Sequence, residues 1–282
     1  MPKRDLAAMD KDMFSPIGRL LGQAMSDGLN NDIIQPGMET GQDTMQGVYA
    51  ESVTQICSIG TRRVVVDDWG VRVFRYASAD GTLAAGELQQ GAVNGGNTTY
   101  QHDLTAAVAL AGATTVTFTT ITDTLVANAM AGGFLAVTDG PDQGSLYRIV
   151  SHAAGAAGAL AFVIDRGVTT AWTTSTRVTV IDNPYKNVIQ APVTTPTGPA
   201  VGVPVIPVTD NYFFWLQTFG WANCLVKTAL TAGVSVIRDV AAAGSVGIQV
   251  AGAGSLITEV VGYSGYVADT TDSGLVFLTL AP

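Results

Sequence analysis

Charged side chains are scarce in this chain. Asp, Glu, Lys and Arg make up only 13% of its 282 residues, whereas hydrophobic residues make up 47%. A chain that is poor in charge and rich in apolar residues lacks the composition of a disordered protein. Lys and Arg are outnumbered 14 to 23 by Asp and Glu, which gives a net charge of −9. Because DNA and RNA are held through basic residues that neutralise phosphates, this balance argues against a nucleic-acid partner.

Cysteine and long apolar runs are also scarce. Cys57 and Cys224 are the only cysteines, and they are too few for a disulfide framework, so we predict that both are small buried side chains. No segment approaches the roughly 20 consecutive apolar residues of a membrane span. The first residues lack the apolar core of a secretory signal. We therefore expect no membrane partner and synthesis in the cytoplasm.

The residue types that carry catalysis are thinly spread. His102 and His152 are the only histidines, and no metal-ligand spacing, nucleophile elbow, phosphate loop or dinucleotide fingerprint occurs. Asp139 and Asp142 could contribute to a Ca²⁺ site, but they bring too few carboxylates, and their turn-rich context favours local backbone hydrogen bonds. The sequence thus predicts no catalytic, cofactor-binding or metal-binding residues, and a protein that is not an enzyme.

Proline, by contrast, is concentrated in one stretch. Six of the eleven prolines lie between residues 184 and 210. Proline fixes φ and removes a backbone donor, which excludes both a helix and a central strand. The Val and Ile residues between the prolines would be poor choices for a solvated coil. We predict an ordered, extended strap along apolar surface that joins two β-rich halves, with an ordinary inter-domain linker as the alternative.

The segments on either side of this strap predict the fold class. Short runs of β-branched and aromatic residues alternate with turn dipeptides, and residues 132–151 form the clearest hairpin pattern. Such spacing is typical of an antiparallel sandwich or barrel. We predict an all-β chain of antiparallel sandwich-like or barrel-like domains. Its expected divisions are a body domain at 47–183, the strap at 184–210 and a small C-terminal β domain at 211–282.

Residues 1–46 are predicted to form an extended N-terminal arm that carries one short helix. Ser15 suits the N-cap position, and Pro16 suits the first helical position. A single short helix is not stable alone in water, so its apolar stripe should dock on its own body or on a neighbouring subunit, and we favour the neighbour. The predicted partner-contact residues of this stripe are Ile17, Leu20, Leu21 and Met25.

The densest aromatic patch follows the strap, at residues 212–215. Consecutive residues of a strand point to opposite faces, so both faces of this strand would be aromatic. A free-standing domain rarely leaves such a pair in water, so either the strap or a partner should cover it, with ordinary core packing as the alternative. We predict partner contacts at Tyr212, Phe214 and Trp215.

A weak internal echo links the two halves. A β run that begins near Trp69 leads to Leu83-Ala-Ala-Gly86, and a β run that begins near Phe219 leads to Leu230-Thr-Ala-Gly233. The echo indicates either a duplicated β unit or a strand-turn-strand sequence pattern that arises independently in a chain rich in Gly and Ala.

Several of these segments resemble a group of tailed-phage virion proteins that are encoded beside the major capsid protein. The segments are GGFLAVTDGPDQGSLYRI at 132–149, NPYKNVIQAP at 183–192, TPTGPAVGVP at 195–204 and NYFFWLQTFGWA at 211–222. The C-terminal strands around the LTAG turn also resemble small β domains of capsid decoration proteins. The resemblance covers residues 47–282 and leaves the arm aside.

This resemblance implies a non-enzymatic decoration or cement protein that binds the outside of a bacteriophage capsid and stabilises contacts between capsomers. Its partners would be the major capsid protein and further copies of itself, with a trimer favoured, and it would reach the virion after synthesis in the host cytoplasm. The acidic balance agrees with a position away from the packaged DNA. The alternatives are, in order, a tail or baseplate component, a glycan-binding or glycan-cleaving surface protein, and a surface-layer or adhesin module.

Overall fold

The computed structural model describes residues 33–34, 46–92, 100–193, 196–248 and 259–282. The secondary-structure elements of these residues are all strands, which confirms the prediction of an all-β chain. The predicted arm helix and its contact residues Ile17, Leu20, Leu21 and Met25 lie outside the described residues. The strands are β1 (Ile33–Ile34), β2 (Arg62–Asp67), β3 (Gly70–Ser78), β4 (Gln89–Gln90), β5 (Tyr100–Thr105), β6 (Thr115–Ile121), β7 (Phe134–Asp139), β8 (Leu146–His152), β9 (Gly158–Ile164), β10 (Arg177–Ile181), β11 (Ile189–Gln190), β12 (Ala200–Pro204), β13 (Phe213–Leu225), β14 (Ser235–Arg238), β15 (Val246–Ile248), β16 (Val260–Ser264) and β17 (Ser273–Thr279).

These strands form two sheets. The larger sheet follows the order β1-β2-β3-β13-β17-β16-β14-β15, with β4, β11 and β12 attached beside this path. The smaller sheet has the order β5-β10-β7-β8-β9-β6, and it curls until Ala106, next to β5, bridges Phe118 of β6. Among the described strands, every pair is antiparallel except β1 with β2. The predicted antiparallel character is therefore also confirmed.

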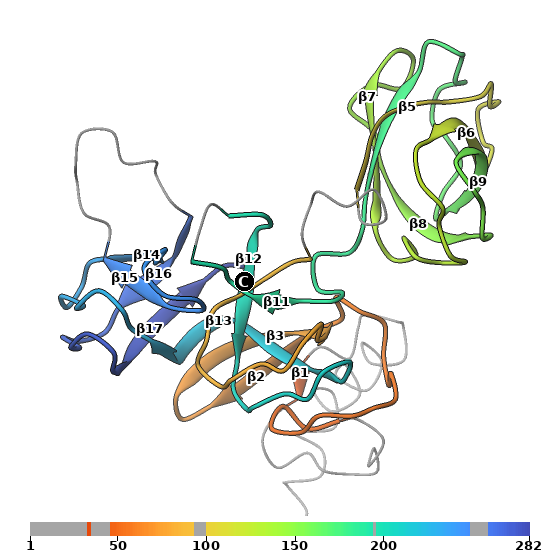
Figure 1. Cartoon of the computed structure of the whole chain (residues 1–282). Helices are drawn as coiled ribbons and strands as arrows, with labels where there is room; N and C mark the ends of the chain where they lie inside the picture. The colour runs from red at the N-terminus through yellow and green to blue at the C-terminus, as the bar shows by residue number, and fades with distance from the viewer. Residues whose placement is uncertain (1–32, 35–45, 93–99, 194–195, 249–258) are drawn as a thin grey trace, which may run out of the picture.

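The smaller sheet is an insertion into the larger one. Strands β4 and β11 pair with each other, although the whole smaller sheet lies between them in the sequence. Figure 1 shows this sheet standing apart from the other strands. Its main buried cluster draws only on residues between Leu104 and Val180. Below, residues 100–181 are the inserted unit, and the described parts of 46–92 and 188–282 are the main body.

The sheets divide the chain differently from the predicted domains at 47–183 and 211–282. Strand β3 lies in the first of these segments and β13 in the second, yet they form one antiparallel ladder from Phe213 opposite Ser78 to Phe219 opposite Val73. The main body is therefore built from both ends of the described chain. A local sequence pattern indicates that a segment is a strand, but it does not indicate which distant strand it pairs with.

The proline-rich strap is built into the main body instead of lying between two halves. All five residues of β12 are buried, and this strand lies between β4 and β13. The expectation that its prolines exclude a central strand was too strict. Ala200 and Gly202 pair with β4, whereas Val203 and Pro204 pair with β13. Each of these ladders is only two residue pairs long, so β12 needs few backbone donors on either side.

One four-strand arrangement that includes a glycine turn occurs three times in the described chain. In each unit the first strand pairs with the fourth, the second pairs with the third, and one isolated bridge joins the two connections. The strap unit uses β3, β4, β12 and the first half of β13, the inserted unit uses β5, β6, β9 and β10, and the C-terminal unit uses the second half of β13, β14, β16 and β17. The bridges are Leu83 with Val208, Ala109 with Trp172, and Leu230 with Ala268.

Each unit turns at an equivalent glycine, three residues after its first bridging residue. Gly86, Gly112 and Gly233 have φ angles of 81°, 86° and 74°, a left-handed conformation in which a Cβ would clash with the backbone. Each glycine N–H donates to the carbonyl that lies four residues before the second bridging residue, which belongs to Pro204, Val168 or Ser264.

The turn sequences of the three units are LAAG at 83–86, ALAG at 109–112 and LTAG at 230–233. The internal echo in the sequence identifies the first and the third. The second escapes it because its first two residues stand in a different order. The echo therefore corresponds to equivalent positions in a repeated structural unit.

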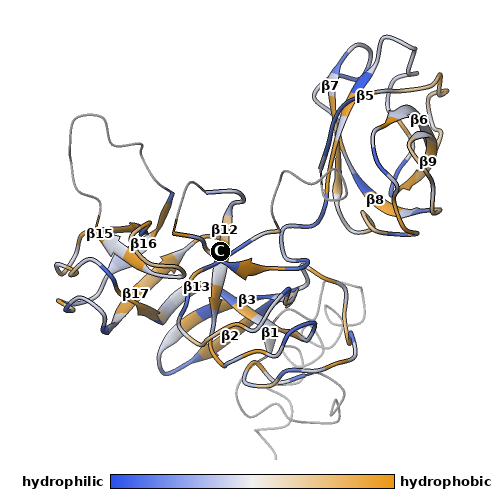
Figure 2. Ribbon diagram, viewed as in Figure 1, coloured by the Kyte–Doolittle hydropathy of each residue, from blue (hydrophilic) through white to orange (hydrophobic). Residues whose placement is uncertain are grey.

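Alternation along the strands builds the buried cores of the main body and the inserted unit. Figure 2 shows hydrophobic residues along the strands of both the main body and the inserted unit. Val276 and Leu278 of β17 are buried, for example, while the residues beside them point outward. Burial of one face of each curled sheet supplies most of the driving force for this fold.

We expect Gly233→Ala to destabilise the chain by about 1–2 kcal/mol, because alanine must adopt the left-handed conformation there. Apart from Gly233 and its two chain neighbours, no atom lies within 4 Å of an added Cβ at this position, so the loss reports the local backbone alone. Urea unfolding followed by tryptophan fluorescence measures it. Gly47→Ala is the matched control, since its Cβ also enters open space and its φ is not left-handed. Equal losses in the two variants would contradict this account of the turn.

Candidate functional site: an aromatic face and a polar junction

The outer side of the C-terminal unit carries a row of aromatic side chains. Trp221 of β13 lies opposite Phe277 of β17, and Phe277 lies opposite Tyr263 of β16. Because directly paired residues share a face, the three rings line up across three neighbouring strands. Trp221 is 36% exposed and Tyr263 is 50% exposed. Together with the neighbouring outward side chains of Phe219 and Leu275, they form what is called the aromatic face below.

The rings of this face interlock and do not lie flat. Trp221 and Phe277 meet at 83° and Phe219 and Phe277 at 77°, with centroids 5.1 Å apart in both pairs. Gly265 makes room for the Trp221 ring, since an added Cβ would stand 2.8 Å from it. Edge-to-face packing of this kind is typical of protein cores and interfaces. The aromatic rings of this face therefore pack against one another as side chains do in a protein core or interface.

The equivalent face of the strap unit is covered by the chain itself. Tyr76 and Trp215 occupy that face, pair across β3 and β13, and are almost fully buried. Residues 46–59 lie over them: the Trp215 indole N–H donates to the Gln46 carbonyl at 2.8 Å, and the Tyr76 hydroxyl donates to the Gln46 side-chain oxygen at 3.0 Å. Val48 joins the same buried cluster. Within the described chain, the aromatic face of the C-terminal unit has no such cover.

The residues predicted for partner contact after the strap lie mostly inside the chain. Phe214 is 0% exposed and Trp215 is 1% exposed, and they belong to two different cores on opposite sides of β13. Only Tyr212 is half-buried. The interpretation as contact residues does not fit Phe214 or Trp215, because a partner cannot reach them. The two faces were correctly expected to need cover, but the strap and residues 46–59 supply it.

The aromatic face was missed at the level of sequence. Phe219 and Trp221 alternate with small residues, which was the available signal for a face of one strand. The alternation does not show that Phe277 and Tyr263 would extend the row, because β16 and β17 lie about forty or more residues further along the chain.

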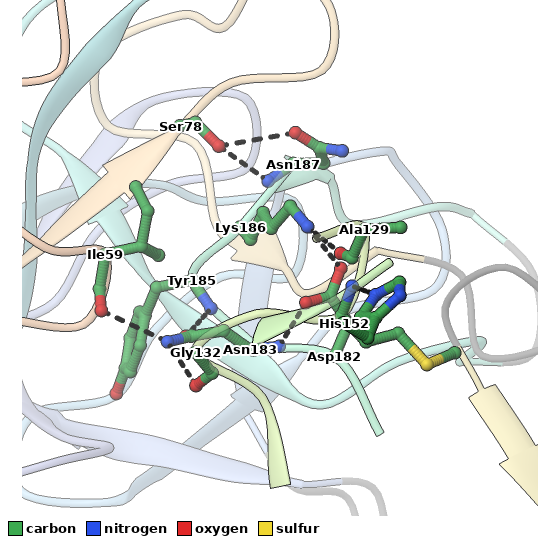
Figure 3. A network of polar contacts seen from close by, with 11 residues as sticks. Ile59, Ser78, Ala129, Gly132, His152, Asp182, Asn183, Tyr185, Lys186 and Asn187 are labelled. Carbon is green, nitrogen blue, oxygen red and sulfur yellow. Dashed lines mark hydrogen bonds and ion pairs between the residues drawn. The ribbon is translucent and has the colours of Figure 1, made fainter. Parts of the chain in front are cut away.

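The inserted unit is attached to the main body by a polar junction, shown in Figure 3. The side-chain N–H₂ of Asn183 donates to the carbonyl of Ile59 in the main body at 3.1 Å and to that of Gly132 in the inserted unit at 3.2 Å. The Lys186 ammonium donates to the carbonyl of Ala129 and pairs with Asp182 at 3.1 Å. These contacts hold the two bodies together with hydrogen bonds in place of a shared apolar core.

Two buried titratable groups support this junction: His152 of the inserted unit and Asp182, which directly follows that unit. Burial raises the pKa of the Asp182 carboxyl, although the Lys186 ammonium acts against that rise. His152 accepts the main-chain N–H of Met130 at Nε2 and contacts the carbonyl of Ala153 from Nδ1 at 2.8 Å. A carbonyl can only accept, so Nδ1 carries the proton. The His152 ring therefore has a structural role, because it links the main chain of Met130 to that of Ala153.

The remaining residues singled out in the sequence have structural partners. Asp142 accepts hydrogen bonds from Tyr147 at 2.5 Å, Trp172 at 3.0 Å and Ser145 at 2.9 Å. Asp139 accepts the N–H of Gly140. The prediction that both cysteines are buried holds for Cys224 but not for Cys57, which is half-buried. Cys224 is completely buried, and burial raises the pKa of its thiol to about 12.

Comparison with known proteins adds no identification. No family model, curated protein or solved structure matches this chain. Among the residues that the structure describes, no three His, Cys, Asp or Glu side chains are grouped as metal ligands would be. In the same residues, no helix has the length and apolarity to cross a bilayer. The functional argument therefore depends on the geometry of the aromatic face and the junction.

We expect Asn183→Ala to loosen the junction. The variant removes one donor group from two carbonyls in different bodies, which should cost about 1–3 kcal/mol. Urea unfolding measures the loss, and limited proteolysis at residues 182–188 reports the exposure of the junction. The control is Asn223→Ala, which removes an exposed amide from the outer side of β13. Equal protease resistance in both variants would show that Asn183 does not join the bodies.

We expect the carboxylate of Asp142 to stabilise the inserted unit above acidic pH. Burial opposes its charge, but the hydrogen bonds from Tyr147, Trp172 and Ser145 hold its pKa below the ordinary value of 3.8. A lowered pKa contributes stability at pH values above that ordinary value and loses it as the pH falls through the folded-state pKa.

Asp142→Asn tests this expectation, because asparagine tolerates the left-handed φ of 71° at this position. At neutral pH the variant should lose about 1–3 kcal/mol relative to the parent chain. The gap should narrow below about pH 4, where the unfolded carboxyl becomes protonated. Urea titrations at both pH values measure the gap, and Asp139→Asn is the control. A gap that stays constant with pH would contradict the role of the charge.

Proposed function

We propose that this chain is a non-enzymatic structural protein of a tailed-phage virion, of the capsid decoration or cement type. In this proposal it binds the major capsid protein on the outside of the shell and stabilises contacts between capsomers. It is made in the host cytoplasm and self-associates, with a trimer favoured. The resemblance of residues 47–282 to phage virion proteins supports the proposal that the protein is part of a virion. The aromatic face supports a docking role.

The observation that carries the docking role is the uncovered aromatic face. The equivalent face of the strap unit is buried under residues 46–59, whereas the described residues leave Trp221, Tyr263 and Leu275 accessible. Exposed aromatic rings that are already packed against one another lose little conformational freedom on binding, which makes them effective anchors. Burying them against a partner stabilises the complex by about 25 cal/mol for each Å² of apolar surface removed from water.

A cement protein acts through contacts that exist only in the assembled shell. Binding to the assembled state and not to free subunits shifts the equilibrium towards the shell by mass action. The proposed decoration protein needs no catalytic group for this action. The predicted arm helix with Ile17, Leu20, Leu21 and Met25 remains a second proposed contact with a neighbouring subunit.

A tail or baseplate component would use the same kind of face, and it differs only in the virion part that it binds. The glycan-binding alternative fits the aromatic face less well. Flat platforms are needed to stack sugar rings, whereas Trp221 and Phe277 meet almost at right angles. We therefore favour a protein partner for this face.

Replacing exposed residues of the aromatic face should weaken capsid binding without unfolding the chain. We expect the double variant Tyr263→Ser, Leu275→Ser to bind phage heads stripped of the protein about tenfold or more weakly, as central interface residues do. Co-sedimentation over a concentration series measures the affinity, and particle imaging gives the position.

The matched control is Val108→Ser, Val126→Ser, because these side chains are 69% and 70% exposed on the inserted unit. The control should bind like the parent chain. Saturable binding of the parent chain to tails instead of heads would favour the tail component. If both double variants decorated heads as well as the parent chain, the aromatic face would not be the docking surface.

A further inference from the structure

A cleft of about 450 Å³ lies at the junction of the two bodies. Its wall comes from the segment before β2, the end of β3, the loop before β7, strand β8, the start of the strap and the residues that lead into β13, so neither body forms it alone. Figure 3 shows part of this wall, with Ser78, Asn187 and Lys186 close together. A cleft of this size accommodates a ligand of one or two rings.

The charge of the cleft is opposite to that of the chain. Arg148 and Lys186 line it, and none of the described lining residues is acidic, although the chain as a whole carries a charge of −9. The charge of Lys186 is partly balanced by Asp182. The main-chain N–H of Arg148 binds Asp165, whereas its guanidinium makes no hydrogen bond or ion pair in the described part of the chain. This guanidinium is therefore available to a ligand anion.

The rest of the lining offers donors, acceptors and one apolar wall. Four amide side chains line the cleft. Gln55 donates its N–H₂ to the Cys57 carbonyl, and the oxygens of Asn128 and Asn187 accept from the His152 N–H and the Ser78 hydroxyl, so these two residues offer their N–H₂ groups as donors to sugar hydroxyls. Phe213 adds an aromatic side chain, and its ring is held parallel to Tyr76 at a centroid distance of 6.1 Å. The four amides are Gln55, Asn128, Asn187 and Asn211.

We propose that the junction cleft is a binding site for an acidic saccharide, a sugar ring that carries a carboxylate. The guanidinium of Arg148 would pair with the carboxylate, the amides would bind the ring hydroxyls, and Phe213 would contact the apolar side of the ring. The proposal does not depend on capsid decoration, since it concerns a different surface from the aromatic face and is tested on the isolated chain.

The test is a calorimetric titration of the full chain with three probes: glucuronate, glucose and acetate. Glucuronate should bind saturably, with a dissociation constant on the order of 1 mM or tighter. Glucose lacks the charge and acetate lacks the ring, so each should bind about tenfold or more weakly. Equal binding of acetate would reduce the site to a simple anion site and overturn the proposal, as would equal binding of glucose.

Two variants connect the binding to the cleft. Arg148→Gln should weaken glucuronate binding about tenfold or more, because it removes the charged partner. Asn211→Gly should weaken it while preserving the left-handed φ of 63° at this position. The control is Arg177→Gln, since Arg177 lies on the inserted unit outside the cleft and should leave binding unchanged. Full binding in both cleft variants, or no saturable binding in the parent chain, would overturn the proposal.

Discussion

The main body depends on the continuous pairing of one long strand, the 13-residue β13. Its first half pairs with β3 and its second half with β17, so the strap unit and the C-terminal unit share a backbone. The change of partner coincides with a register shift between Gln217 and Phe219. It also coincides with Gly220, where a Cβ would stand 2.5 Å from the carbonyl oxygen of Val71. The outer faces of the two units are consequently neighbouring parts of one surface.

The same four-strand unit has a different outer face in each of its three positions. In the strap unit this face is apolar and lies under residues 46–59. In the inserted unit it carries the ion pair of Arg177 with Asp103. In the C-terminal unit it is aromatic and exposed. The repeated backbone therefore does not determine the function of a unit, which depends on the side chains of its outer face and on what covers them.

The junction between the bodies follows a different rule. Apolar cores form within each body, whereas the contacts between them are hydrogen bonds of Asn183 and Lys186. Polar contacts leave room for a cleft, because polar side chains need not pack as closely as the apolar side chains of a core. The aromatic face and the cleft thus offer the two kinds of surface that proteins use for different ligands, one apolar and exposed and one polar and concave.

Much of the fold was predictable from local pattern. Alternation and turn residues determined an all-β antiparallel chain, and the Val and Ile residues of the strap indicated order. Local pattern could not show that β3 and β13 share a ladder, that Phe214 and Trp215 are buried on both sides, or that Trp221, Phe277 and Tyr263 form a row. The sequence by itself determined which segments become strands, because that depends on neighbouring residues. Only the tertiary structure decided which aromatic side chains remain accessible, because exposure depends on strand partners and covering segments that are distant in the chain.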